Sequence, residues 1–229
     1  GLRRGRRAVQ RRPEPELMDD AAQAAAYSEA DFSAPHQFLV DQARVLLPAL
    51  PTTARVLDLG CGPADVTLRF ARAFPGWQID GVDGAPAMLA LSRARVAAAG
   101  LDARVRLHQA VLPQQPLPGA GYQVILSNSL LHHLHDPAVL WEALRTAAAP
   151  GAAVYVTDLR RPPDEATLRR LVQECITTEP AVLRRDFKAS LRAAFTVPEV
   201  RAQLDAAGLS ALAVTPLTDR HLAVTGYVP

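Results

Sequence analysis

The sequence has 229 residues, 49% of them hydrophobic, which is enough to bury one α/β core and does not call for a second domain. No apolar run approaches the roughly eighteen residues of a membrane span, and no apolar segment follows the N-terminal charges as it would in a secretory signal. We therefore expect one cytoplasmic globular unit without membrane contact.

The net charge of +2 is unevenly distributed, because six arginines and no acidic residue stand in the first twelve positions. Without these six, 19 of the 25 basic side chains remain against 23 acidic ones, a net charge of −4. An arginine run without aromatic residues is typical of a disordered segment, although it could also contact nucleic acid or anionic lipid. We expect residues 1–16, the N-terminal leader, to be disordered and residues 1–12 to be dispensable. The acidic remainder makes nucleic acid an unlikely partner.

The two cysteines, Cys61 and Cys175, stand in unrelated contexts without C-x-x-C spacing. This pattern argues against a disulfide framework and a thiolate metal site.

The order of predicted elements indicates the fold class. Residues 17–50 read as a helical cap in two pieces, broken near 31–35. Strands alternating with helices of this length are typical of a parallel, doubly wound sheet. Residues 159–195 form a mostly helical insertion, and the last two strands could pair as a hairpin. The predicted strands are 55–59, 77–83, 104–109, 122–127, 152–158, 212–215 and 221–227, and the helices after the cap are 64–74, 86–99, 137–149 and 198–207.

The strongest motif is the glycine-rich turn that follows the first strand and opens a helix. Ligands of open α/β sheets bind at the carboxyl ends of the strands, and glycines there let the backbone approach a ligand closely. A dinucleotide loop would place a glycine three positions after Gly62, but Asp65 stands there, close to where a pyrophosphate would lie. NAD is therefore disfavoured.

This turn resembles the first motif of the class I S-adenosylmethionine-dependent methyltransferase family, D-x-G-x-G-x-G. Asp58, Gly60 and Gly62 match the motif, and Ala64 replaces its last glycine. The resemblance implies S-adenosylmethionine as the cofactor, bound along the loop that includes Cys61, with its ammonium group held by Asp58. It also implies a Rossmann-like, mostly parallel seven-stranded sheet with an antiparallel C-terminal strand, and methyl transfer to a small-molecule acceptor.

Two further strand ends complete the cofactor site that the resemblance implies. Asp83 closes the second strand, 21 residues after the second loop glycine, where an acid accepts from both ribose hydroxyls. Gly84 and Met88 would then lie beside the adenine ring. The family commonly places an acid after the third strand to read adenine. This chain has none there, so Gln109 or backbone groups would take that role.

The segment 127–137 resembles the corresponding segment of small-molecule methyltransferases and carries three histidines. If it turns directly into a helix, Asn128 and His132 share a face, while His133 lies about 100° further round. Asn128 would then face the cofactor, His132 would be the better candidate base, and His133 would pack or face solvent. His36 and Asp158 are the alternative bases.

Three histidines in four residues also suggest a metal, but no H-E-x-x-H or matching carboxylate spacing accompanies them, so no metal is predicted. Asp158, Arg160 and Arg161 leave the fifth strand towards the expected acceptor pocket, where an arginine could hold an acidic group.

Methyl transfer mainly requires alignment of nucleophile, methyl and sulfur, and it needs a base only if the acceptor must lose a proton. Two alternatives stay open. One is a cofactor-binding protein of the same fold without turnover, and the other is a methyltransferase that acts on nucleic acid or protein. No motif indicates the acceptor atom or the oligomeric state.

Overall fold

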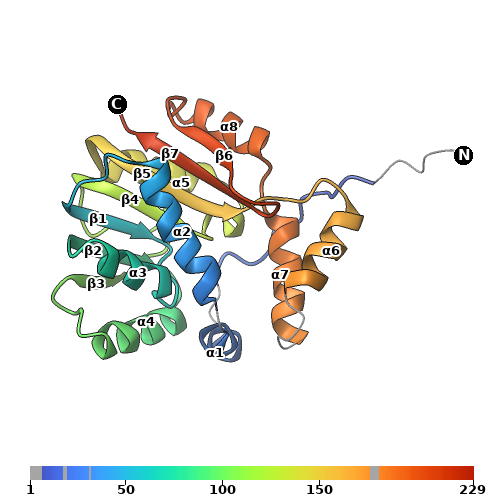
Figure 1. Cartoon of the computed structure of the whole chain (residues 1–229), viewed down its shortest axis with the longest axis horizontal. Helices are drawn as coiled ribbons and strands as arrows, with labels where there is room; N and C mark the ends of the chain where they lie inside the picture. The colour runs from blue at the N-terminus through green and yellow to red at the C-terminus, as the bar shows by residue number, and fades with distance from the viewer. Residues whose placement is uncertain (1–6, 18–19, 31, 176–180) are drawn as a thin grey trace, which may run out of the picture.

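The computed structural model describes residues 7–17, 20–30, 32–175 and 181–229, so the leader arginines at positions 3, 4 and 6 lie outside the described residues. Its centre is one seven-stranded sheet of order β3-β2-β1-β4-β5-β7-β6, in which only β7 runs antiparallel to its neighbours (Figure 1). This is the predicted Rossmann-like sheet, including the C-terminal hairpin of β6 and β7. The strands are β1 (Thr53–Leu59), β2 (Gly76–Asp83), β3 (Val105–Gln109), β4 (Tyr122–Asn128), β5 (Ala148–Leu159), β6 (Ala213–Pro216) and β7 (His221–Tyr227).

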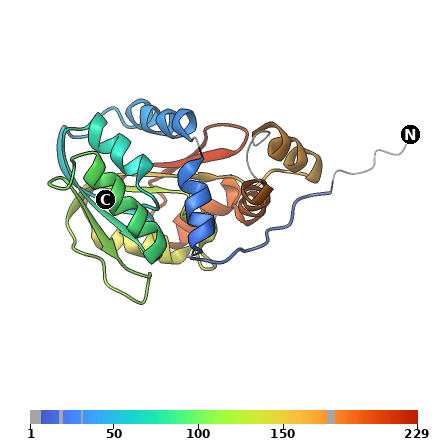
Figure 2. The same cartoon turned by 90° about the horizontal axis from the view of Figure 1, so that it is seen from below.

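Helices cover both faces of the sheet and also stand beyond the carboxyl ends of its parallel strands (Figures 1 and 2). None of the helices that the structure describes combines the length and apolar character needed to cross a membrane. The helices are α1 (Ala21–Glu29), α2 (Ser33–Leu46), α3 (Asp65–Ala73), α4 (Pro86–Ala98), η1 (Leu131–His133), α5 (Ala138–Ala147), α6 (Glu165–Cys175), α7 (Ala181–Ala193) and α8 (Val197–Ala206).

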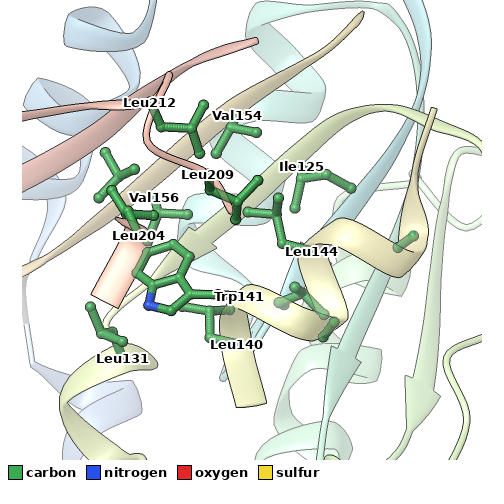
Figure 3. Close-up of a cluster of buried hydrophobic side chains, with 14 of the residues drawn as sticks. Ile125, Leu131, Leu140, Trp141, Leu144, Val154, Val156, Leu204, Leu209 and Leu212 are labelled. Carbon is green, nitrogen blue, oxygen red and sulfur yellow. The ribbon is translucent and has the colours of Figure 1, made fainter. Parts of the chain in front are cut away.

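Side chains alternate between the two faces along each central strand, and each face packs against a different set of helices. In β1, Val56 packs with α2, α3 and α4, whereas Leu57 points to the opposite face and packs with α5 and α8. Figure 3 shows the second of these layers, where the fully buried Trp141 lies among leucines from α5 and α8. The Trp141 indole N–H donates to Gln203 at 3.0 Å, which joins the two helices. Parallel pairing of β1 with β2 and with β4 holds the carboxyl ends of these three strands side by side.

The N-terminal leader differs from its prediction, because residues 7–16 pack on the body of the protein. Val9 is buried with α6 and α7 in a small core that lies apart from the sheet. The Arg11 guanidinium stacks over the Phe195 ring at 4.0 Å and donates to the carbonyls of Ala193 and Leu134. Figure 2 shows the leader running past α6 and α7 towards α1. The charge composition predicts a solvated segment, but the burial of Val9 and the contacts of Arg11 hold the leader against the rest of the protein.

We predict that Arg11→Ala lowers the free energy of unfolding by about 2 kcal/mol, because it removes hydrogen bonds from a charged donor and a cation–π contact. Urea unfolding measures the change. Arg12→Ala is the matched control: the Arg12 side chain is exposed, and its backbone N–H, which alanine keeps, donates to the Arg192 carbonyl. The control should stay within about 0.5 kcal/mol of wild type. Equal stability of both variants would mean that the leader is dispensable after all.

Candidate functional site

A cavity of about 350 Å³ opens at the carboxyl ends of β1, β2 and β4, which is a volume typical of small-molecule sites. The loops after β1, β2, β3 and β4 form one side of it. The other side comes from residues before the sheet, namely Glu16, Leu17, Ala30, Phe32, Ser33 and His36.

The glycine-rich loop after β1 turns through three alternate left-handed positions, Gly60, Gly62 and Ala64, with φ of 74°, 51° and 67°. The Gly60 N–H donates to the Val82 carbonyl at the end of β2. A Cβ at Gly60 would lie 2.9 Å from the Leu130 Cβ, so this position requires glycine for space as well as for φ. The alanine that replaces the last glycine of the motif adopts the conformation the motif needs, at a cost in backbone strain.

Asp83 fastens this loop to the second strand. One of its carboxylate oxygens accepts from the Gly62 N–H and the other from the Ala85 N–H, both at 2.9 Å. These bonds position Asp83 at the cavity wall, where the sequence predicted an acid.

Asp58 and Cys61 also line the cavity, and both are buried. Burial raises the pKa of Asp58 to about 6, against the opposing hydrogen bond from Thr67, and the charge of Asp83 raises it further. Burial also raises the pKa of the Cys61 thiol well above its ordinary value. A cation bound here would be stabilised by two adjacent carboxylates, which suits the ammonium end of a methionine group.

Of the residues predicted to lie near adenine, Gly84 and Met88 line the cavity, whereas Gln109 does not. The Gln109 side chain is exposed at the end of β3, and the cavity is lined instead by the next residues, Ala110 and Val111. The structure therefore favours backbone groups for the adenine contact.

At the end of β4, His132 and His133 have exchanged the positions that the sequence predicts for them. Ser129 has a φ of 60°, and the chain then forms the short 3-10 helix η1 in place of a regular α-helix from Asn128. Asn128 lines the cavity, and its amide oxygen accepts from the Thr157 hydroxyl at 2.9 Å. His133 also lines the cavity, while His132 is buried outside it.

His132 stands between two carboxylates. Its Nδ1 lies 2.6 Å from Asp158 Oδ1 and its Nε2 lies 3.1 Å from Glu14 Oε1. Its backbone N–H also donates to Asp158. Burial alone would lower the pKa of His132, but attraction to Asp158 and Glu14 raises it to about 9. An enclosed imidazolium of this kind is unsuited to be the base, and Asp158, which pairs with it at 2% exposure, is likewise removed from the cavity.

Two other imidazoles reach the cavity. Burial, together with the neighbouring His132, lowers the pKa of His133 to about 4, so this ring is neutral and weakly basic. His36, from α2, has its Nδ1 2.6 Å from Asp65 Oδ2, and Arg69 donates to the same oxygen at 2.9 Å. The hydrogen bond with His36 holds the pKa of Asp65 well below its usual range. Asp65, which disfavours NAD at the loop, therefore orients the His36 ring in the cavity.

Arg160 and Arg161 do not contribute to the cavity lining. Arg160 donates to the Thr218 carbonyl at 2.8 Å, and Arg161 donates to the Ala194 carbonyl and pairs with Glu199. The expected role of these arginines in holding an acidic substrate is not supported by their positions.

Comparison with known proteins finds similarity to methyltransferases. Residues 56–151 match the family model described as a methyltransferase domain. A trans-aconitate 2-methyltransferase of Variovorax paradoxus is 35% identical over 135 residues, which cover 57% of this chain and 49% of the relative. An S-adenosylmethionine-dependent methyltransferase from Aquifex aeolicus superposes with a TM-score of 0.67 at 17% identity, over 92% of this chain and 99% of that one.

Residues 56–151 therefore carry a methyltransferase domain similar to that of the class I S-adenosylmethionine-dependent methyltransferase family. The family, the fold and the cofactor predicted from the sequence are thereby confirmed. A further structure of the same fold, a plantazolicin methyltransferase in complex with S-adenosylhomocysteine, superposes with a TM-score of 0.66 at 13% identity over 90% of each chain. The chain spans about half the length of the curated relatives it matches.

We predict that Gly60→Ala lowers the free energy of unfolding by about 2–4 kcal/mol, through left-handed strain and overpacking against Leu130. Ala64→Gly is the matched control in the same loop. Relief of strain there opposes the loss of a buried methyl group and the added backbone freedom, so the change should stay within about 1 kcal/mol. Urea unfolding distinguishes the two, and a Gly60→Ala variant as stable as wild type would contradict the close approach to Leu130.

We predict that S-adenosylhomocysteine affinity falls as the pH drops through about 6, the raised pKa of Asp58. An aspartate with an ordinary pKa of about 3.9 would stay ionised there, whereas Asp58 takes up a proton and ceases to attract the ammonium group. The decrease should reach up to about tenfold per pH unit. Calorimetry from pH 5 to 8 measures it, with Asp58→Asn as a weak binder without this pH dependence. Constant wild-type affinity would contradict the role of Asp58.

Proposed function

We propose that this chain transfers the methyl group of S-adenosylmethionine to a small-molecule acceptor bound in the same cavity. The observation that carries the proposal is that one cavity contains both the paired acids Asp58 and Asp83 and a second wall built by the N-terminal segments. A cavity closed over in this way favours a small acceptor over a nucleic-acid or protein surface.

When bound, the cofactor supplies a methyl group on a positively charged sulfur, which is displaced in line by the acceptor. Asp58 would hold the ammonium end of the cofactor and Asp83 its ribose, in the cavity that the loop after β4 also lines. Asn128 is fixed by Thr157 at that loop and offers its NH₂ group as a donor. Phe32 and other apolar residues of the N-terminal wall exclude water. Alignment in a dry site is the main contribution that this reaction requires.

His36 is the proposed base for an acceptor that must lose a proton. Its Nδ1 is held by Asp65, which orients the ring and stabilises the imidazolium that proton transfer would form. The Phe32 ring lies against it, with centroids 5.6 Å apart. His132, the candidate favoured by the sequence, is replaced in this role because carboxylates face both of its ring nitrogens.

The charges of the cavity also bear on the acceptor. Among the described lining residues, Arg95 is the sole arginine and no lysine occurs, whereas four side chains are acidic: Glu16, Asp58, Asp65 and Asp83. A tricarboxylate, as the relative's name implies for that protein, needs several cationic partners to leave water. We therefore propose an acceptor that carries less negative charge than trans-aconitate.

We predict that the protein releases S-adenosylhomocysteine from S-adenosylmethionine with a phenol, quinol or amine acceptor faster than with trans-aconitate. With the best acceptor, His36→Ala should lower kcat by about 100-fold or more if His36 is the base. His108→Ala is the matched control, because His108 pairs with Asp80 at 2.9 Å outside the cavity.

Mass spectrometry of acceptor and cofactor products gives the rates. Tight cofactor binding without turnover on any of these acceptors would favour the non-catalytic alternative. Full turnover of His36→Ala from pH 6 to 9 would show that transfer needs no base at this position.

A further inference from the structure

Three potential metal ligands converge beside the cavity, from segments more than a hundred residues apart. Glu14 belongs to the N-terminal leader, and His132 and His133 belong to η1. Glu14 Oε1 lies 3.1 Å from His132 Nε2 and 3.4 Å from His133 Nδ1, and all three atoms lie within 4.8 Å of one another. No local sequence motif reveals this set, because Glu14 lies in the leader, far from the two histidines.

The buried Nε2 of His132 has no hydrogen-bond partner among the described residues, although the side chain is only 4% exposed. The Glu14 oxygen lies 3.1 Å away, but this contact does not have the geometry of a hydrogen bond. Buried polar nitrogens are rarely left in this state. On the other side of the ring, Nδ1 is held by Asp158 at 2.6 Å. A carboxylate on Nδ1 and a buried Nε2 without a hydrogen-bond partner is the arrangement of a histidine whose Nε2, once deprotonated, binds a metal.

We propose that Glu14, His132 and His133 bind a divalent transition-metal ion, with zinc the best match to their chemistry. Two imidazoles and one carboxylate are a known zinc ligand set, and they leave a fourth position for water or an acceptor oxygen. Ligands about 2.0–2.1 Å from a tetrahedral ion stand about 3.3 Å apart. The two distances from Glu14 lie on either side of that value.

The proposed ion would tie the leader to the loop after β4 and border the cavity through His133. It uses neither Asp58 nor Asp83, so cofactor binding does not depend on it. The competing occupant is a proton, which would make His132 an imidazolium between Glu14 and Asp158. The Pro15 carbonyl, 3.4 Å from His133 Nδ1, would compete with the ion for that nitrogen only as a long hydrogen bond.

The test loads the full chain with zinc sulfate, dialyses it against metal-free buffer and measures zinc by mass spectrometry. We expect one zinc ion per chain and a higher melting temperature with zinc than after chelation, because the ion binds only the folded chain. Glu14→Gln and His133→Ala should each weaken zinc binding by about 100-fold or more. Circular dichroism confirms that both variants fold.

His108→Ala is the control, since His108 pairs with Asp80 at 2.9 Å and lies outside the three-ligand set. It should retain zinc, and its loss of zinc would instead indicate nonspecific binding to the histidines of the chain. Absence of zinc from the wild type, or unchanged binding in both ligand variants, would overturn the proposal in favour of the protonated ion pair. S-adenosylhomocysteine binding is measured separately, so failure of the methyl-transfer proposal would leave this result standing.

Discussion

The hydrogen bond from the Gly62 N–H to the Asp83 carboxylate is the interaction on which the site depends. It joins the glycine-rich loop to the neighbouring strand end and so fixes the distance between Asp83 and the buried Asp58. Two carboxylates held this close repel each other, and the charge of Asp83 adds to burial in raising the pKa of Asp58. A cation relieves that repulsion. The loop is therefore organised before the ligand arrives, and it discriminates against the phosphates of a dinucleotide by charge as well as by shape.

A second buried constraint holds the loop after β4. Asp158 accepts from both the backbone and the ring of His132, which fixes η1 against the end of β5. Glu14 approaches the same ring from the leader. Burying two carboxylates is costly unless a cation lies between them, whether that cation is an imidazolium or a metal ion. The leader is consequently coupled to the site electrostatically as well as through the apolar contact of Val9 and the stacking of Arg11 on Phe195.

Most of the residues that the sequence predicts for the cofactor half of the site reach one cavity, because their sequence signals are local. Asp58, the loop glycines and Asp83 follow strands whose apolar patterns mark where they end. The prediction failed where structure depends on contacts between distant segments. Arg11 meets partners 123 and 182 residues away, which composition cannot reveal. The histidine pair was misassigned because one left-handed residue, Ser129, rotates the following turn and exchanges the faces of His132 and His133.

The contrast between local signals and distant contacts also separates the cofactor site from the acceptor site of the enzyme proposed here. The parallel strands supply the acids and the loop that any member of this family needs, so they carry recognisable motifs. The proposed acceptor wall is built from the leader, α2 and η1, whose residues lie far apart in the sequence. Such a wall can change its charge and shape without disturbing Asp58 or Asp83. Similarity to a trans-aconitate methyltransferase over the shared sheet therefore constrains the cofactor far more than the acceptor, and the four acids that line this cavity weigh more in assigning the substrate.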